Sequence, residues 1–240
     1  YAVGLVNKYT AATTFIDQEI CFPNQGGRNY CPQNYDRKWH GLSQMRYALG
    51  NSLNIPAVKM LKLNGIEAMI STASAMGITT FTNPDNYGLS LTLGGGEVKM
   101  VDMATAFGVF ANGGYRIDLR PVLKITDKTG KILEEYKPHT SPIFGKKVFD
   151  EGIAYIISDI LADNGARIAA FGDNSQLKIP GQTVSVKTGT TNDYRDNWTI
   201  GYTPSFLVTT WVGNNDNTPM SNIASGVTGA APIWNDIMTY

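Results

Sequence analysis

In the first two thirds of the chain, apolar residues recur every three or four positions, the spacing of amphipathic helices. The pattern predicts helices over residues 44–50, 56–62, 66–76, 98–111 and 151–161. Glycine or an Asn-Gly pair follows several of them, as is usual at helix C-termini, at 64–65, 77, 112–114 and 164–165. Ser43 and Asp150 are predicted N-terminal caps. The pattern of residues 1–6 predicts the later part of a helix that begins before Tyr1, so we expect further sequence upstream.

The last third changes to the two-residue alternation of β-strands. Three such runs, around residues 184–187, 198–202 and 206–212, predict an antiparallel three-strand meander that a final helix over residues 230–238 can cover. A separate short hairpin is predicted at residues 121–136, with its turn at 127–130. The predicted fold class is therefore α+β, a C-terminal antiparallel sheet and helix flanked by a mainly helical part. We expect one domain over residues 1–240, mainly helical at 43–165 and containing the sheet at 180–240.

Composition excludes several classes of protein. Lys+Arg and Asp+Glu number 20 each, and this balance argues against a dedicated nucleic-acid binder. No apolar run is long enough to span a membrane. The glycine triplet 94–96 precedes Glu97, whose carboxylate would repel a phosphate, and so it predicts a tight turn and no nucleotide cofactor.

Two cysteines, Cys21 and Cys31, bracket a segment rich in proline, glycine and asparagine. Their spacing fits no common zinc pattern, because neither His40 nor His139 adds a second ligand pair, and no metal site is predicted. We expect a small disulfide and hence an oxidising compartment. A reduced pair in a cytosolic protein is the alternative.

Two short segments carry the chemistry-bearing residues. The first is the polar turn Ser52-Leu53-Asn54 between two predicted helices, which would hold its side chains rigidly. The second is the strand end Lys187-Thr188-Gly189-Thr190, where Gly189 lets a substrate backbone approach closely and add to the strand edge. Each has a structural alternative: Ser52 and Asn54 as helix caps, and Lys187 as a solvated lysine on an ordinary edge strand.

The chain contains the tripeptide Lys-Thr-Gly twice. The copy Lys128-Thr129-Gly130 lies in the charged turn of the predicted hairpin, and we assign it no role. Only the second copy continues into the polar and aromatic run that ends at Trp198.

Taken together, a Ser-x-Asn turn followed much later by Lys-Thr-Gly on a strand resembles the penicillin-recognising serine transferases and hydrolases. The chain is most similar to the transpeptidase domain of class A, bifunctional penicillin-binding proteins, through residues 46–49, 52–58, 87–97, 110–114, 187–198, 201–204 and 211–213. The resemblance implies a β-lactamase/transpeptidase-like fold and a cofactor-free D,D-transpeptidase that cross-links peptidoglycan stem peptides by serine acyl transfer and binds β-lactams. It also implies an upstream glycosyltransferase domain, a membrane anchor and an extracytoplasmic location, with no nucleic-acid partner.

The resemblance also implies a role for each site residue. Ser52 would relay a proton to the leaving amine, and Asn54 would hydrogen-bond the substrate amide and the lysine of the family's nucleophile motif. Lys187 would supply positive potential and attract the substrate carboxylate. Thr188 and Thr190 would offer hydroxyls to that carboxylate, and the Thr190 N–H would form half of the oxyanion hole.

One motif of the family is missing. The family's nucleophile belongs to a Ser-x-x-Lys motif that should fall just before Tyr1. A second difference is Leu53, which occupies a position where the family often has aspartate. The match Ser175–Lys178 lies in a loop-like segment, where serine and lysine do not share a helical face. We therefore expect this chain alone to be inactive.

Two alternative functions stay open. One is a non-catalytic penicillin- or peptide-binding sensor or scaffold. The other is a serine β-lactamase, although no segment resembles that family's water-activating loop. A Ser-x-x-Lys motif upstream of Tyr1 would support an enzyme, and its absence would support the non-catalytic module.

Overall fold

The structure, a computed structural model, describes residues 1–23, 27–137, 145–191, 194–220 and 228–240. Its helices are α1 (Ala2–Val6), α2 (Met45–Gly50), α3 (Asn54–Asn64), α4 (Ile66–Met76), η1 (Pro84–Asn86), η2 (Leu89–Leu93), α5 (Met100–Ala111), α6 (Glu151–Ala162), α7 (Asn164–Phe171) and α8 (Ala230–Thr239). Its strands are β1 (Thr14–Asp17), β2 (Gly41–Gln44), β3 (Tyr115–Arg116), β4 (Lys124–Thr126), β5 (Ile132–Glu135), β6 (Lys146–Lys147), β7 (Ser185–Thr190), β8 (Asp196–Tyr202) and β9 (Leu207–Gly213).

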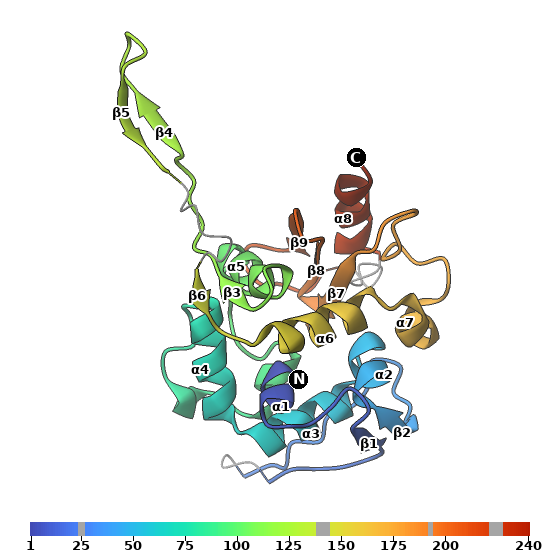
Figure 1. Cartoon of the computed structure of the whole chain (residues 1–240). Helices are drawn as coiled ribbons and strands as arrows, with labels where there is room; N and C mark the ends of the chain where they lie inside the picture. Colours follow the sequence, from blue (N-terminus) through green and yellow to red (C-terminus); the bar gives the residue numbers. More distant parts are fainter. Residues whose placement is uncertain (24–26, 138–144, 192–193, 221–227) are drawn as a thin grey trace.

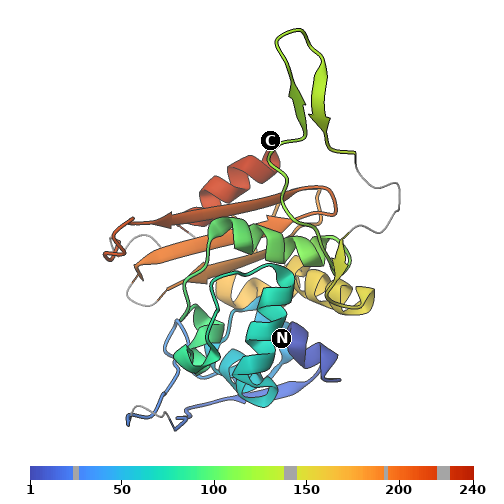
Figure 2. The same ribbon diagram turned by 90° about the vertical axis from the view of Figure 1, so that its left-hand side faces the viewer.

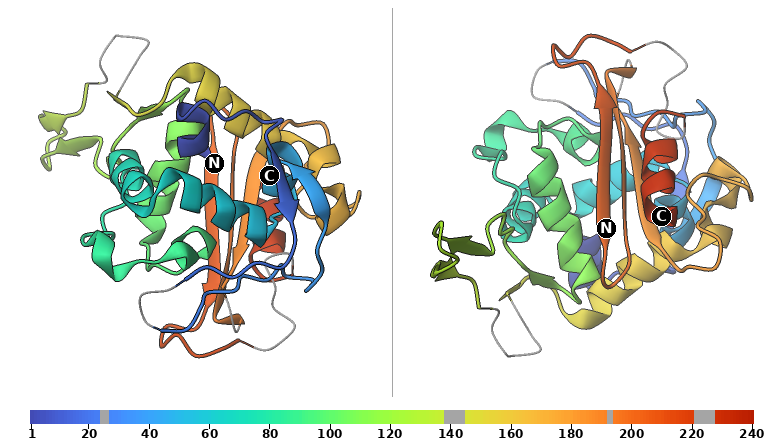
Figure 3. Two further views of the ribbon diagram at one scale, coloured as in Figure 1. Left: turned by 90° about the horizontal axis from the view of Figure 1, so that it is seen from below. Right: turned by 90° about the horizontal axis from the view of Figure 1, so that it is seen from above.

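The predicted meander is present as a three-stranded antiparallel sheet in the order β7-β8-β9 (Figure 1). Helix α8 covers one face, and α5 and α6 lie against the other (Figure 3). The core between α8 and the sheet centres on Trp234, which is fully buried. Gly201 of β8 makes room for this indole, because a Cβ there would lie 2.3 Å from Trp234 Cζ2. The α+β prediction is confirmed.

A second core holds the helical part together. Its fully or nearly buried members come from α1, β1, α2, α3 and α6: Leu5, Phe15, Met45, Met60, Ile157 and Leu161. Figure 2 shows these helices stacked below the sheet. The predicted helices over 66–76 and 98–111 correspond to α4 and α5, and Gly77, after α4, has the left-handed φ of 111° that a helix C-terminus often adopts.

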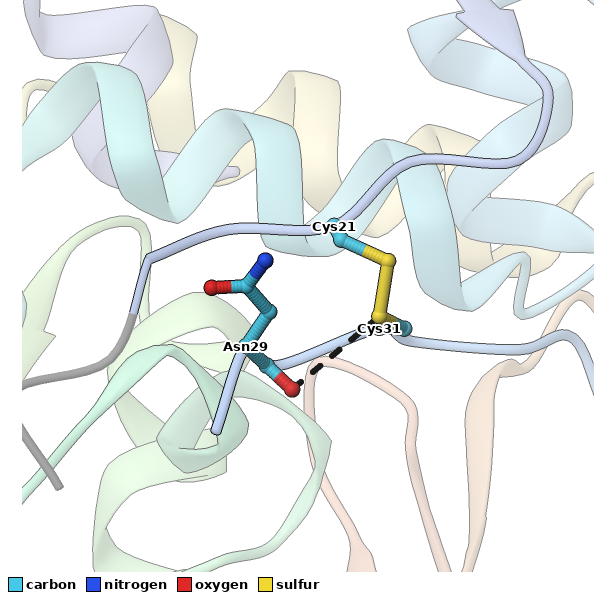
Figure 4. Close-up of a disulfide and its surroundings, with 3 residues drawn as sticks. All are labelled: Cys21, Asn29 and Cys31. Carbon is cyan, nitrogen blue, oxygen red and sulfur yellow. Dashed lines mark hydrogen bonds between the residues drawn. A yellow bond between two sulfur atoms is a disulfide. The ribbon is translucent and has the colours of Figure 1, made fainter. Parts of the chain in front are cut away.

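The segment before α2 contains two strands that the sequence pattern did not predict. β1 pairs antiparallel with β2, and the loop between them contains the Cys21–Cys31 disulfide (Figure 4). The predicted disulfide is therefore confirmed. Cys31 Sγ lies 4.0 Å from the carbonyl oxygen of Asn29. This contact is not a hydrogen bond, because a disulfide sulfur has no hydrogen to donate. Ser43 lies in β2 and does not cap α2, so that prediction was wrong: pairing with Phe15 buries it in the strand.

Two predictions about helix ends need correction. Asp150 does occupy the N-cap position of α6, but its side chain pairs with Lys147 at 2.6 Å and makes no cap hydrogen bond. Asn164-Gly165 does not end the helical region. Asp163 accepts a hydrogen bond from the Ala166 N–H, caps a new helix at this point, and thereby starts α7.

The predicted hairpin, β4–β5, projects away from the rest of the protein (Figures 1 and 2). Within the described ranges, no helix is long and apolar enough to cross a membrane. The described residues likewise contain no group of histidine, cysteine or acidic side chains suited to a metal ion. His139 lies outside the described residues.

Candidate active site

Ser52 lies in a turn that closes the C-terminus of α2. The N–H of Ser52 donates to Leu49 O at 3.2 Å, and the N–H of Leu53 donates to Ala48 O at 2.9 Å. These two bonds form the Schellman arrangement that ends many helices. The residue at this position must then adopt the left-handed backbone conformation, and the φ of Ser52 is 58°. Glycine normally fills this position because a Cβ is unfavourable there. A serine in its place indicates that its hydroxyl is needed.

Asn54 is the first residue of α3, directly after the turn. Its backbone N–H donates to Asn34 Oδ1 at 2.9 Å, and its side-chain Nδ2 donates to Gln33 O at 2.7 Å. The loop that carries the disulfide therefore holds both the backbone and the carboxamide of Asn54. With Nδ2 bound in this way, Oδ1 is the acceptor that the side chain can offer to a cation.

Lys187 reaches this turn from the edge strand β7. Its ammonium donates to Ser52 Oγ at 2.7 Å and to the carbonyl of Thr188 at 2.7 Å. The first bond joins residues 135 positions apart in the chain. Burial of the ammonium, and secondly the positive charge of Arg167, lowers the pKa of Lys187 to about 8.

Arg167, on α7, is the charged neighbour of this site that sequence analysis missed. It is 4% exposed, and its guanidinium donates to the carbonyls of Leu161 and Val186 and to Asn164 Oδ1. Burial lowers the pKa of Arg167 to about 10, against the opposing effect of the Asp163 carboxylate. A lone arginine on a short helix carries no sequence signal for this role, because only the fold brings it against β7.

Helix α7 is in turn fixed to the end of α2. Asn51 Nδ2 donates to Ala166 O at 2.6 Å, and Asn51 Oδ1 accepts from the Ala170 N–H at 2.9 Å. Gly50 permits this contact, since a Cβ there would lie 2.8 Å from Ala166 O. The two residues before Ser52 thus hold the helix that carries Arg167.

The other predicted residues of β7 lie beside Lys187. Thr188 is buried at 9% exposure, whereas Gly189 is exposed and Thr190 is partly exposed at the end of the strand. A Cβ at Gly189 would meet Trp198 Cβ at 3.9 Å, an ordinary contact. Packing therefore does not require glycine at this position. Among the described residues no strand pairs with the outer edge of β7, where a ligand backbone could lie.

Neither of the other sequence matches forms a site. Lys128 lies in the hairpin turn, where Asp127 accepts hydrogen bonds from Thr129 and Lys131. The Ser175 hydroxyl accepts from the Leu177 N–H at 3.0 Å, and Lys178 pairs with Asp173 at 3.6 Å. Ser175 and Lys178 thus have other local partners.

Comparison with known proteins identifies close relatives. The family described as penicillin binding protein transpeptidase domain matches residues 2–239. Penicillin-binding protein 1A of Neisseria meningitidis serogroup A is 30% identical over 243 residues, which cover 100% of this chain and 30% of that protein. Penicillin-binding protein 1A of Clostridium botulinum strain Langeland is 33% identical over 240 residues, covering 96% of this chain and 27% of that protein. The chain therefore spans less than a third of the length of these relatives.

Solved structures share the fold. The crystal structure of penicillin-binding protein 1A from Haemophilus influenzae superposes with a TM-score of 0.81 at 26% identity, covering 100% of this chain and 40% of that one. PonA1 from Mycobacterium tuberculosis superposes with a TM-score of 0.83 at 20% identity, covering 99% of this chain and 64% of that one. The predicted β-lactamase/transpeptidase-like fold is confirmed.

Proposed function

Because this chain belongs to the transpeptidase domain family of penicillin-binding proteins, we propose that it is the greater part of a serine D,D-transpeptidase domain acting on peptidoglycan stem peptides. The observation that carries this proposal is the 2.7 Å hydrogen bond from Lys187 Nζ to Ser52 Oγ. It links the two motifs that, in the family, belong to one site. Packing alone gives no reason for a serine with a left-handed backbone to contact a buried ammonium.

Lys187 and Ser52 act as a proton-relay pair in this proposal. Ser52 Oγ accepts from the Lys187 ammonium, so the Ser52 hydroxyl proton is available for donation to another atom. When the bond between the penultimate and terminal D-alanines breaks, the departing nitrogen needs a proton. Ser52 donates it and is reprotonated through its hydrogen-bonded neighbours.

The nucleophile comes from a Ser-x-x-Lys motif upstream of Tyr1. Its serine attacks the carbonyl of the penultimate D-alanine, and the terminal D-alanine leaves as an amine. An amine of a neighbouring strand then attacks the acyl-enzyme and releases the serine. Asn54 Oδ1 accepts from the lysine of that motif, since Gln33 O already holds the Asn54 amide nitrogen.

Binding of the substrate uses the edge of β7. An extended peptide adds along residues 187–190, with its carboxylate attracted to the Lys187 ammonium and received by the hydroxyls of Thr188 and Thr190. The N–H of Thr190 provides half of the oxyanion hole. β-Lactams bind at the same strand edge in this proposal, and the family's description as penicillin binding proteins supports β-lactam binding.

The domain works outside the cytoplasm, as part of a longer protein with a glycosyltransferase domain and a membrane anchor. The Cys21–Cys31 disulfide supports this location, since such bonds persist in oxidising compartments. The names of the relatives support the larger assembly, because each is a penicillin-binding protein 1A of which this chain covers less than a third.

Labelling with a fluorescent penicillin tests the proposal. A chain extended upstream to include Ser-x-x-Lys is expected to become covalently labelled, while residues 1–240 alone stay unlabelled. In the extended chain, Lys187→Ala is expected to slow acylation by about a hundredfold or more.

Lys128→Ala is the matched control for that variant, because it alters the same tripeptide in the exposed hairpin turn, and it is expected to leave the rate unchanged. Labelling of residues 1–240 would place the nucleophile inside this chain and contradict the proposal. Equal effects of the two lysine variants would show that Lys187 has no special role. Rapid release of the label would identify a β-lactamase instead.

A further inference from the structure

The first turn of α3 is capped by a side chain from a distant part of the sequence. The residue at the N-cap position, Leu53, has no side-chain acceptor, and no cap bond forms from it. Asn34 supplies the acceptor instead. Its Oδ1 receives the N–H of Asn54 at 2.9 Å and, more weakly, the N–H of Ile55 at 3.5 Å. Asn34 thus serves as an N-cap from 20 positions upstream, although it accepts from the first and second N–H groups of the helix where an ordinary N-cap accepts from the second or third.

Asn34 completes the hydrogen bonding of this helix terminus. A helix leaves its first N–H groups without internal partners. Here the Leu53 N–H bonds to Ala48 O in the preceding turn, and Pro56 has no N–H. Asn54 and Ile55 therefore carry the remaining donors, and both point at the Asn34 oxygen.

Asn34 is itself firmly held. Its Nδ2 donates to Asp17 Oδ2 at 2.7 Å and to Lys38 O at 2.8 Å. The same Asp17 oxygen accepts from the His40 N–H at 3.1 Å. Asn34 is 5% exposed and Asp17 is fully buried on β1. An amide in this environment has one orientation, because reversing it would place its oxygen against the Asp17 carboxylate.

We propose that Asn34 is a positioning residue for the turn formed by Ser52, Leu53 and Asn54. It does not touch the reacting atoms. It fixes the start of α3, and with the neighbouring carbonyl of Gln33 it fixes the direction of the Asn54 side chain. Without it the first turn of α3 loosens, and Ser52 Oγ and Asn54 Oδ1 lose their placement relative to Lys187. This inference rests on the proposed function, in which both groups take part in proton transfer.

The capping itself is tested on residues 1–240 by amide hydrogen exchange, which requires no activity. In the wild-type chain the Asn54 amide is expected to exchange far more slowly than an exposed loop amide. Asn34→Ala is expected to remove that protection at Asn54 and Ile55. Asn29→Ala is the matched control in the same loop, because none of the side-chain hydrogen bonds found among the described residues uses the Asn29 carboxamide, and it is expected to leave the exchange unchanged.

The positioning role is tested by β-lactam acylation of the full-length protein, measured per folded molecule and separated into binding and acylation steps. Asn34→Ala is expected to slow the acylation step about tenfold or more while the binding step changes little. Asn34→Asp sets a second carboxylate against Asp17 and is also expected to be slow.

Each result gives a decision. Unprotected exchange at Asn54 in the wild-type chain overturns the capping, even if Asn34→Ala does not fold. Altered exchange with an unchanged acylation rate overturns the positioning role. A wild-type full-length protein that is never acylated would refute the proposed function, while the exchange data would still decide the capping.

Discussion

Ser52 shows how one residue serves two opposing demands. The turn after α2 requires a left-handed backbone, which favours glycine, while the contact with Lys187 requires a hydroxyl. Left-handed backbone costs a residue with a Cβ roughly 1–2 kcal/mol. The structure tolerates this cost because the Schellman bonds and the buried Leu53 side chain fix the turn.

Replacing Ser52 separates the two demands. Ser52→Gly relieves the backbone but removes the hydroxyl that accepts from Lys187, so its free energy of unfolding is expected to stay within about 1 kcal/mol of the wild type. Ser52→Ala removes the same acceptor and keeps the backbone strain, so it is expected to be the less stable of the two. Thermal unfolding of residues 1–240 measures this order.

In the extended protein both variants are expected to lose acylation by about a hundredfold, because neither carries the hydroxyl. A glycine variant that is less stable than the alanine variant would contradict this account of the turn.

At the scale of elements, the site depends on α7, a helix between the two motifs in the sequence. Asn51, at the end of α2, bonds this helix at two points, and Arg167 of the same helix bonds the carbonyl of Val186 next to Lys187. Helix α7 thereby brings a buried positive charge to the lysine, and this charge opposes the protonation of Lys187 together with burial.

This arrangement predicts a pH dependence. The pKa of Lys187 is lowered to about 8, so the ammonium is lost as pH rises through that value, and the acylation rate of the extended protein is expected to fall there. Arg167→Met removes a positive charge, favours the protonated lysine, and is expected to move the fall upward by about one pH unit. Arg167→Lys keeps the positive charge, so the pH at which the acylation rate falls is expected to stay near its wild-type value.

Acylation rates of both variants, measured between neutral and alkaline pH, test this prediction. If the rate of Arg167→Met falls at the same pH as that of the wild type, burial alone sets the pKa of Lys187.

Over the whole molecule, stability comes from two main cores on either side of the site. One lies between α8 and the sheet, and the other joins α1, β1, α2, α3 and α6. The β4–β5 hairpin belongs to neither, and all residues of both its strands are exposed. At its base, Arg120 lies 4.3 Å from the ring centre of Tyr136.

Removal of the hairpin tests whether stability comes from the two cores and not from the hairpin. Replacing residues 122–135 by a Gly-Ser-Gly linker keeps the contact at the base and is expected to leave the melting temperature and the acylation rate close to wild type. Trp234→Ala is the contrasting variant, since it empties the centre of a core, and it is expected to cost about 3–5 kcal/mol. Thermal unfolding compares the two. A hairpin deletion as damaging as Trp234→Ala would mean that the hairpin contributes to the folded core.

Sequence pattern was sufficient where the information is local. The spacing of apolar residues predicted α4, α5, α6, the meander and α8, because periodicity records which face of an element is buried. It failed where the deciding partner is distant or the pattern is short. Strands β1 and β2 have four residues each, too few for a clear alternation. Helix α7 begins with Asn164-Gly165, a pair that was predicted to lie beyond a helix end.

By itself, the sequence determined the fold class and the two motifs that contain Ser52 and Lys187, and it favoured a Cys21–Cys31 disulfide that the structure then confirmed. Only the tertiary structure decided that Asn34 caps α3 and that Arg167 lies against β7. The physical reason is that a helix cap or a buried charge needs a polar atom at a set distance and direction. Chain segments far apart in sequence supply that atom at no fixed spacing, so its identity emerges only when the chain is folded.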